Sequence, residues 1–356
     1  MMWKYNKGEW SEIYTFAYLL SSGILYAADE DLNRVEDVFF PVIRIIREET
    51  AGEPIDYFTG ETIKIFKGEE LLKEVNKEEF ESIVGVLLEK IPEGSRAFEI
   101  PEAEEFFESV YCEKVKANST KKEDITTQLH DINTGINPVC GFSIKSFLGA
   151  NPTLINAGAN TNFEYVVDGC TDEIMEEVNA INTRNKLIDR MDALLGYGCG
   201  FTPVHHSISP QFEENLQYID SLMPEFVQYM VLYSYIYNIK SAEEIINKMA
   251  EHNPLGFTKP SLYSYKYKKL LAAWALGLTP ERSDWEGAED ANGGYITVKA
   301  NGDVVCYHLY NRTQFEQYLF DYTVFERASS SRYHYLEIYK EDDVYKVKLN
   351  LQVRFR

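Results

Sequence analysis

The sequence lacks the patterns of several protein classes. Its 356 residues include five cysteines and six histidines, and no two cysteines stand in a Cys-x-x-Cys spacing. We therefore expect reduced thiols in a cytoplasmic protein, with neither a disulfide scaffold nor a zinc site. The adjacent pair His205 and His206 is typical of a turn, because neighbouring side chains on a strand or a helix point in different directions.

Long apolar runs are also missing. Residues 13–28 are too short and too polar to cross a bilayer, and residues 216–239 are interrupted by Asp220, Pro224 and Glu225. Two acidic residues near the N-terminus interrupt any apolar segment of the kind that a signal peptide needs. These absences predict a protein without a membrane segment or a signal peptide.

An excess of positive charge is missing as well. The chain has 35 Lys and Arg residues against 57 Asp and Glu residues, which gives a formal net charge of −22. This balance excludes a uniformly basic coat for nucleic acid, but it leaves room for a local basic cleft because the acids are unevenly placed. Residues 48–113 hold 19 acids and 6 bases, so we expect them to form a solvated face or an insertion.

The remaining composition is that of a globular protein, with 45% apolar and 26% charged residues. At this length we expect two domains, residues 1–200 and residues 201–356, with a boundary near residues 200–210. The sequence shows no internal repeat and no low-complexity tract.

Periodic and alternating apolar patterns predict a mixed α/β (α+β) fold. Helical spacing covers residues 8–22, 171–195, 213–238, 241–251 and 260–276. Thr171 and Gly196 match the start and the end of the second helix. Strand alternation covers residues 124–131, 139–147, 162–167, 293–299, 304–310 and 345–356.

The first two strands carry residues suited to catalysis. A turn centred near residues 134–135 sets Asp124 opposite Lys145 in an antiparallel hairpin. Ser143 shares their face because side chains alternate along a strand. A carboxylate is an oxygen ligand suited to Mg²⁺, and a nearby ammonium group can orient water or offset charge on a phosphate oxygen. This combination suits phosphodiester hydrolysis; an ordinary cross-strand ion pair is the alternative interpretation.

Two glutamates on the predicted N-terminal helix can complete such a site. Glu9 lies in the middle of the apolar stripe of the helix and Glu12 lies at its edge, and a carboxylate there is costly unless it is paired or bound to a metal. If the helix packs beside the hairpin, Glu12 and Asp124 can bind one metal ion. The alternative for Glu9 is a place in the first helical turn, where the dipole favours an acid.

Two further acids compete with these. Asp131 lies seven residues from Asp124, about 23 Å along the strand at about 3.3 Å per residue, so we expect it to cap the following turn. Glu164 alternates with apolar neighbours on the third predicted strand and can face the same side as Ser143.

Several short segments together resemble those of one enzyme family. They are residues 6–12, 122–125, 141–149, 151–156, 161–163, 293–296, 306–308 and 348–352. On these segments the sequence is similar to the HpaII-type restriction endonucleases, which belong to the PD-(D/E)XK nuclease superfamily. The resemblance spans nearly the whole chain, and the set of segments is more specific than the nuclease motif by itself.

The resemblance implies a PD-(D/E)XK-like mixed central sheet flanked by helices. Residues 1–200 would be the nuclease core with the acidic insertion at residues 48–113, and residues 201–356 would be a helical and β-rich region that recognises DNA. The implied activity is that of a type II restriction endonuclease, which hydrolyses double-stranded DNA at a short palindrome with Mg²⁺. The namesake of the family reads CCGG, which is the target that the resemblance suggests.

Carried over to this chain, the resemblance makes Asp124 the metal-binding Asp, Lys145 the motif Lys and Glu12 the acid on the helix. The chain departs from the motif at Ser143, where the superfamily usually has Asp or Glu. One metal ligand is therefore missing from its usual place. Glu12, Glu9 and Glu164 are the candidates to replace it.

DNA recognition needs side chains that reach base edges, and Arg to guanine is the commonest pairing. The candidates are Arg312, Arg332, Lys266 and Asn311, which lie in polar or slightly basic segments. A solvated surface position is the alternative for each of them.

A palindromic target favours a homodimer, because a symmetric site matches a symmetric protein. A companion DNA methyltransferase is expected as well, since unprotected host DNA would be cut. Two other functions stay open at this point. One is a catalytically inactive DNA-binding module with a nuclease fold, which Ser143 makes possible, and the other is a protein-interaction role for residues 48–113.

Overall fold

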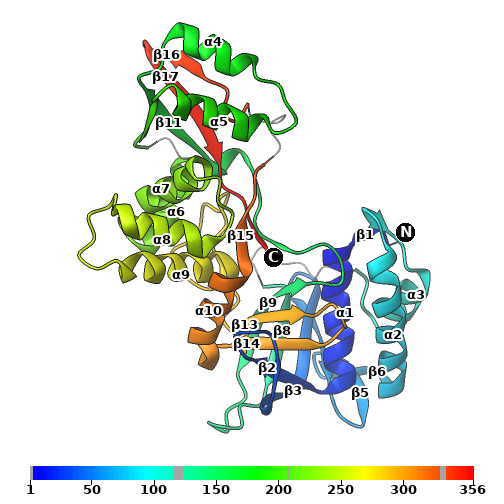
Figure 1. Ribbon diagram of the computed structural model, residues 1–356. Helices are drawn as coiled ribbons and strands as arrows, with labels where there is room; N and C mark the ends of the chain where they lie inside the picture. Colours follow the sequence, from blue (N-terminus) through cyan, green and yellow to red (C-terminus); the bar gives the residue numbers. More distant parts are fainter. Residues whose placement is uncertain (1–2, 115–122, 207–208, 329–333) are drawn as a thin grey trace. The chain divides into compact units, whose positions relative to one another are not determined.

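The computed structural model describes residues 3–114, 123–206, 209–328 and 334–356 (Figure 1). The chain divides into two compact units that both mix helices and strands, as expected. The first unit comprises Met1–Pro152, Ala275–Gly277 and Glu289–Tyr318, and the second comprises Thr153–Trp274, Leu278–Ala288 and Leu319–Arg356. This division differs from the expected boundary near residues 200–210, because two strands from the C-terminal third of the sequence return to the first unit.

The first unit is built on a mixed sheet with the strand order β2-β14-β13-β9-β8-β3-β4-β5-β6. These strands are β2 (Ile24–Ala28), β3 (Arg34–Thr50), β4 (Glu53–Phe58), β5 (Thr62–Lys67), β6 (Glu70–Asn76), β8 (Ile125–Leu129), β9 (Val139–Ser146), β13 (Gly294–Val298) and β14 (Val304–His308). β13 is parallel to β9 and antiparallel to β14. The predicted hairpins β8–β9 and β13–β14 are confirmed.

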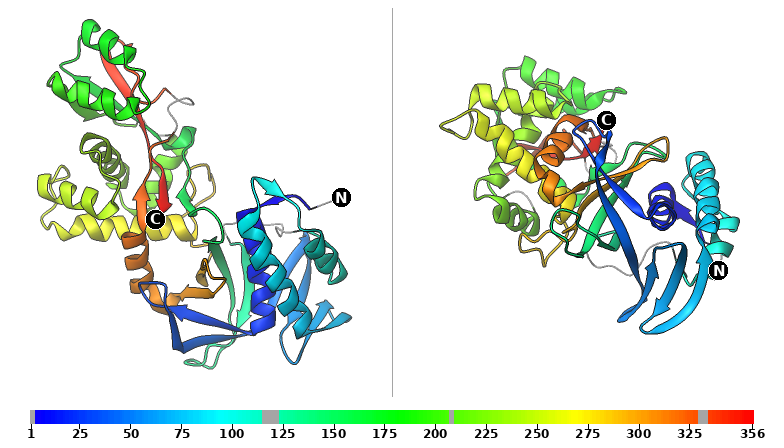
Figure 2. Two further views of the ribbon diagram at one scale, coloured as in Figure 1. Left: turned by 45° about the vertical axis from the view of Figure 1, so that its right-hand side comes forward. Right: turned by 90° about the horizontal axis from the view of Figure 1, so that it is seen from below.

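Three helices cover one face of this sheet: α1 (Lys7–Ser22), α2 (Lys77–Glu93) and α3 (Pro101–Ser109). They lie side by side in Figures 1 and 2. Two short strands, β1 (Tyr5–Asn6) and β7 (Ala97–Phe98), pair next to them. The helix predicted at residues 8–22 is confirmed as α1, which begins at a capping box and ends at Gly23 in the left-handed conformation.

The sheet has an apolar face and a polar face. Phe142 and Ile144 on β9 and Ile296 on β13 are buried in one core with α1. Because side chains alternate along a strand, Ser143 and Lys145 lie on the opposite face. The helices α1, α2 and α3 therefore lie on the side of the sheet opposite to these two residues.

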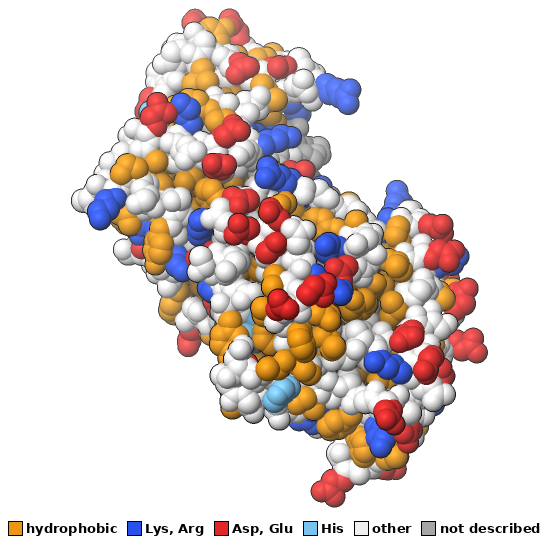
Figure 3. Space-filling model, turned by 60° about the horizontal axis from the view of Figure 1, so that its bottom comes forward, with side chains coloured by type: hydrophobic (Ala, Val, Ile, Leu, Met, Phe, Trp, Pro, Cys, Tyr) orange, Lys and Arg blue, Asp and Glu red, His pale blue; other side chains and the backbone are white. Residues whose placement is uncertain are grey.

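Residues 48–113 belong to the first unit and do not form a separate insertion. β4, β5 and β6 extend its sheet, and Phe80, Ile83 and Leu87 of α2 are buried in the core that α1 shares. The acids of α2 and α3 point outward; the exposed ones include Glu78, Glu81, Glu89, Glu102, Glu105 and Glu108. Figure 3 shows acidic side chains gathered along this edge of the first unit, so the expected solvated acidic face is confirmed.

The second unit contains two small sheets. One has the order β12-β11-β17-β16 and the other has the order β10-β18-β15. The strands are β10 (Thr153–Ile155), β11 (Asn162–Asp168), β12 (Gly200–Pro203), β15 (Thr323–Phe325), β16 (Tyr339–Glu341), β17 (Val344–Asn350) and β18 (Val353–Phe355). The helices are α4 (Asp172–Ala180), α5 (Lys186–Gly196), α6 (Pro210–Ile219), α7 (Met223–Ile236), α8 (Ala242–His252) and α9 (Ser261–Leu276), whose last two residues belong to the first unit. α10 (Arg312–Tyr322) begins in the first unit and ends in the second.

The long helix predicted from Thr171 to residue 195 is wrong, because it is two helices. Thr171 does cap the first of them, since its side chain accepts a hydrogen bond from Ile174 N. The chain leaves the helix after Ala180, and Arg190 of α5 donates to the backbone carbonyl of Asn179 at 2.9 Å. A buried guanidinium group thus satisfies the end of α4, which a sequence pattern does not reveal.

The helix predicted at residues 213–238 is also divided, into α6 and α7. Asp220 accepts a hydrogen bond from Leu222 N at 2.9 Å, which makes a turn between the two helices. Pro224 follows in the first turn of α7, where proline is favoured. In the described part of the chain, no helix combines the length and the apolar composition that crossing a bilayer requires.

Candidate active site

The hairpin of β8 and β9 places Asp124 next to Ser143. Strand pairing joins Ile125 to Phe142, and Ser143 Oγ donates a hydrogen bond to Asp124 Oδ2 at 3.2 Å. The predicted register, which set Asp124 opposite Lys145, is therefore wrong by two residues. Because a shift of two residues preserves the alternation of side chains, Asp124, Ser143 and Lys145 still share one face of the sheet.

The turn of the hairpin explains this shift. Asp131 accepts hydrogen bonds from Asn133 N at 2.9 Å, from Thr134 Oγ1 at 2.5 Å and from the hydroxyl of Tyr310. Its own backbone N–H donates to Ile136 O at 2.9 Å, so the turn is centred between Asn133 and Thr134, one residue earlier than predicted. The hydrogen bond from Thr134, followed by that from Tyr310, lowers the pKa of Asp131 to about 2. The expected capping role of Asp131 is confirmed.

The carboxylate of Asp124 is oriented by the neighbouring strand. Besides the Ser143 hydroxyl, the backbone N–H of Ile144 donates to Asp124 Oδ2 at 2.7 Å. The other oxygen, Oδ1, makes no hydrogen bond to the residues that the structure describes. Asp124 thus presents one fixed and one available oxygen, which is a favourable arrangement for a metal ligand.

Lys145 lies half-buried on the same face, two residues beyond Ser143. Within the described residues no carboxylate lies within ion-pair distance of its Nζ, so the alternative of a cross-strand ion pair with Asp124 is not observed. On β13, Thr297 is the neighbour of Lys145 in the parallel register. Thr297 is completely buried, and its Oγ1 has no hydrogen-bond partner in the described part of the chain.

Tyr295 on β13 is the neighbour of Ser143 on the same face. Burial raises the pKa of Tyr295 well above its usual value, and the charge of Asp124 adds to this effect. Its ring packs on Phe315 of α10, with 5.1 Å between the ring centroids. The Asp124 carboxylate therefore lies next to a largely apolar and buried tyrosine. The sequence pattern did not single out Tyr295 or Thr297, because only strand pairing brings them beside the motif.

Glu9 and Glu12 are both on α1, which packs on the apolar face of the sheet. Glu9 Oε2 accepts a hydrogen bond from Asn6 N at 2.9 Å as part of the capping box, which agrees with the alternative of a helix-start role. Glu12 is half-buried. Across the described ranges, no three or more His, Cys, Asp or Glu side chains gather as a metal-binding group, so the structure does not bring Asp124, Glu12 and Glu9 together.

Glu164 lies in the second unit, on β11. Its Oε1 is 3.3 Å from Lys348 Nζ on the paired strand β17. The local role of Glu164 is this cross-strand ion pair.

The residues expected to contact DNA differ in their partners and in their exposure. Arg312 Nη2 is 2.7 Å from Glu289 Oε1 and its Nε is 3.0 Å from Glu316 Oε1. Lys266 forms an ion pair with Asp220, and Asn311 is half-exposed just before α10. Arg332 lies outside the described residues. Arg312 and Lys266 would have to exchange these carboxylates for phosphate oxygens in order to bind DNA.

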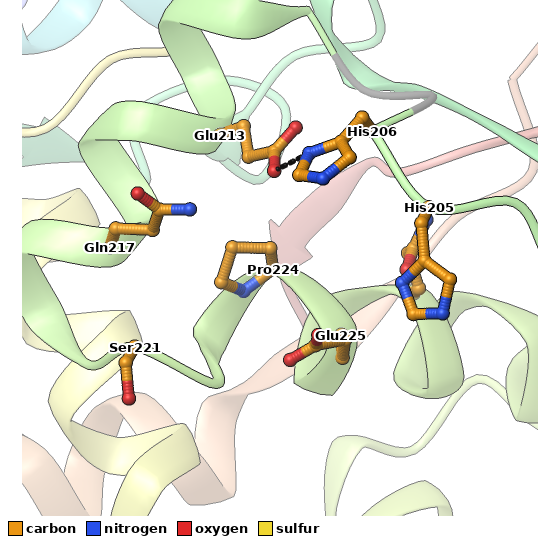
Figure 4. A pocket seen from close by; sticks show the side chains of 8 residues that line it. His205, His206, Glu213, Gln217, Ser221, Pro224 and Glu225 are labelled. Atoms are coloured by element: carbon orange, nitrogen blue, oxygen red, sulfur yellow. Dashed lines mark hydrogen bonds and ion pairs between the residues drawn. The ribbon is translucent and has the colours of Figure 1, made fainter.

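The histidine pair lies at a polar hollow in the second unit (Figure 4). His205 and His206 follow β12 in a turn, and the φ of 57° at His206 confirms the predicted turn. His206 Nδ1 is 2.6 Å from Glu213 Oε1, and Figure 4 shows the two side chains pointing toward each other. Glu225 Oε2, which also lines the hollow, is buried and has no hydrogen-bond partner among the described residues.

An acid thus precedes β8 and a lysine lies on β9, on one face of a mixed sheet whose other face packs on α1. A carboxylate and an ammonium group on one face suit metal-assisted hydrolysis. The comparisons with known proteins identify the class. The family described as HpaII restriction endonuclease matches residues 6–355. The chain is 34% identical over 362 residues to the type II restriction enzyme HpaII of Haemophilus parainfluenzae, and the match covers 98% of each chain. The chain therefore belongs to the HpaII restriction endonuclease family. No solved structure matches it.

Proposed function

We propose that the protein is a type II restriction endonuclease, that it cuts double-stranded DNA at a specific short sequence, and that Asp124, Ser143 and Lys145 form its active site. Membership of the family supports the endonuclease activity. One observation carries the assignment of residues: the three polar side chains share the face of the sheet opposite to the apolar core, and the Asp124 carboxylate is fixed by two donors.

The oxygen atoms on this face are suitable ligands for a magnesium ion. Mg²⁺ is usually held by one or two carboxylates together with water and phosphate oxygens, and Asp124 Oδ1 is available for this purpose. When bound, the ion would neutralise charge on the scissile phosphate and lower the pKa of a bound water.

The residues of the chain do the rest of the chemistry. Ser143 Oγ and Ile144 N hold the Asp124 carboxylate in one orientation. The ammonium group of Lys145 has no carboxylate partner in the described residues, so it can donate a hydrogen bond to a phosphate oxygen or to the attacking water. Fixed donors of this kind stabilise a transition state without having to reorganise.

The target and the partners belong to the same proposal. We infer CCGG as the target sequence, a homodimer that matches its symmetry, contacts from Arg312, Arg332, Lys266 and Asn311 to the DNA, a companion methyltransferase and a cytoplasmic location. Digestion of a defined plasmid with Mg²⁺, followed by sequencing of the ends, tests the target and the cut position directly. Ends that map to another sequence would contradict CCGG and leave the endonuclease activity in place.

The test of the active site uses Asp124→Asn and Lys145→Ala. We expect each to lower the cleavage rate by at least about 100-fold, because each removes a fixed charge from the transition state. Binding of the target duplex in the absence of divalent cations and the thermal unfolding midpoint should stay close to those of the wild type. Lys64→Ala, at an exposed position on β5, is the matched control and should cut normally.

Two results would count against the proposal. Normal cleavage by either active-site variant would show that the substituted residue is not part of the active site. Binding of the duplex without any cleavage by the wild-type protein in Mg²⁺ or Mn²⁺ would favour the alternative, a catalytically inactive DNA-binding module.

A further inference from the structure

The carboxylate of Glu123 lies directly over the backbone of Gly141. A Cβ atom at Gly141 would be 3.0 Å from Glu123 Cδ, 3.1 Å from Glu123 Cβ and closer still to Oε2. The φ of Gly141 is outside the left-handed region, so its backbone conformation does not require glycine. A larger residue at this position would therefore displace the Glu123 side chain.

Gly141 is two residues before Ser143 on β9, so the side on which its Cβ would stand is the polar face of the sheet. Glu123 precedes β8, and its side chain lies against the Cβ position of Gly141, on the face that also carries Asp124. The structure thus brings a second carboxylate to the face that carries Asp124 and Lys145. This carboxylate belongs to the residue before Asp124, whereas the superfamily motif has its acid at position 143.

The backbone of Gly141 is hydrogen-bonded to residues that precede β13. Gly141 N donates to Asn292 Oδ1 at 2.8 Å, and Gly293 N donates to Gly141 O at 2.8 Å. These two hydrogen bonds join β9 to the residues that precede β13.

A buried hydroxyl group lies on the same face. The Thr297 hydroxyl is completely buried beside Lys145 and has no hydrogen-bond partner among the described residues. Buried hydroxyl groups are nearly always hydrogen-bonded.

We propose that Glu123 is the second metal-ligating carboxylate of the active site, in place of the acid that is missing at Ser143, and that Gly141 makes room for it. This inference rests on the proposed nuclease function. Glu9 lies on α1 and Glu164 lies on β11 of the second unit, whereas the Glu123 side chain lies against Gly141 on the face of Asp124. Two carboxylates with water and phosphate oxygens are a sufficient ligand set for Mg²⁺.

The first experiment measures metal binding without DNA. Binding of Mn²⁺, followed by electron paramagnetic resonance, should be weakened at least tenfold by Glu123→Gln, and cleavage of the target duplex should fall by at least about 100-fold. The control Glu81→Gln, at an exposed position on α2, should change neither quantity. Glu12→Gln is measured in parallel; if it weakens Mn²⁺ binding while Glu123→Gln does not, the proposal is overturned.

The second experiment tests the contact between Glu123 and Gly141. Gly141→Ala should lower the thermal unfolding midpoint and weaken Mn²⁺ binding in the wild-type background. In the Glu123→Ala background the same substitution should lower the midpoint much less, because the group that it displaces is gone. Equal shifts in the two backgrounds would show that Gly141 does not make room for Glu123.

The failure of this inference can be told apart from failure of the proposed function. If Asp124→Asn loses Mn²⁺ binding and cleavage while Glu123→Gln keeps both, the active site stands and Glu123 is not part of it. If Asp124→Asn itself keeps cleavage, the proposed active site is wrong, and the role of Glu123 is rejected with it.

Discussion

At the scale of the residue, Ser143 is the departure from the superfamily motif that the structure explains best. Its hydroxyl donates to Asp124 Oδ2 and is itself completely buried against the strand that carries Tyr295. A hydroxyl in this place orients an existing carboxylate, whereas an acid would put a second negative charge beside it. Ser143 is therefore a positioning residue in this site.

Ser143→Ala tests this role. We expect the single-turnover cleavage rate to fall about tenfold, because Asp124 keeps the Ile144 N–H but loses a hydrogen bond to a charged group, worth about 1.5 kcal/mol. The unfolding midpoint should fall by a few degrees, because the same hydrogen bond stabilises the folded protein. A rate equal to that of the wild type would show that the hydroxyl does not orient Asp124.

Asp131 gives a prediction for pH. Its folded-state pKa of about 2 is below the ordinary value of 3.8, because Thr134, Tyr310 and Asn133 donate hydrogen bonds to the carboxylate. The stability that Asp131 contributes is fully present above about pH 4 and is lost as the pH falls toward 2. In urea unfolding between pH 5 and pH 2, Asp131→Asn should lose less stability than the wild type does. Parallel curves would contradict this assignment.

At the scale of the element, β13 begins at Gly294, where the packing of β14 leaves no room for a side chain. Gly294 has a φ of 121°, and a Cβ there would be 3.0 Å from the carbonyl carbon of Tyr307 and closer still to its oxygen. Both neighbours are backbone atoms of β14, which pairs with β13. The close approach of these strands brings Tyr295 and Thr297 beside the motif strand β9.

Gly294→Ala should therefore lower the free energy of unfolding by at least about 2 kcal/mol, because it adds backbone strain and a clash with a carbonyl group. Gly85→Ala is the control, since Gly85 lies within α2 with open space around its Cα. This control should stabilise the protein by up to about 1 kcal/mol. Equal effects of the two substitutions in denaturant titrations would contradict the packing argument.

At the scale of the whole molecule, the exposed acids of α2 and α3 gather on one side of the first unit. The exposed acids lie on the outer surface of α2 and α3 (Figure 3). These two helices cover the apolar side of the sheet (Figure 1). Asp124 and Lys145 lie on the other side. A duplex that reaches Lys145 is therefore kept from the acidic face by the thickness of the sheet and its helices.

The triple variant Glu102→Gln, Glu105→Gln and Glu108→Gln tests this separation. At about 0.15 M salt the Debye length is about 8 Å, so removing these charges from α3 should change affinity for the target duplex by less than about threefold. Fluorescence anisotropy with labelled duplex measures this. A tenfold or larger gain would place the DNA beside α3 and contradict the proposed approach.

The sequence by itself determined the features that depend on neighbours along the chain. The apolar spacing of α1, the alternation of β8 and β9, and the hairpin of β13 and β14 are local patterns, and the structure confirms them. The shared face of Asp124, Ser143 and Lys145 was also predictable, because side-chain alternation survives an error of two residues in the register. The solvated acidic face followed from composition.

The tertiary structure decided what depends on distant parts of the chain. Tyr310 supplies one of the hydrogen bonds to Asp131, which fixes the turn and therefore the register of β8 against β9. Strands that begin near residue 294 complete the sheet started near residue 24, so the boundary between the units could not be read from linear composition. The place of Glu123 over Gly141 also depends on tertiary structure. The packing of the strands decides which carboxylate reaches the polar face, and a local sequence pattern does not contain that information.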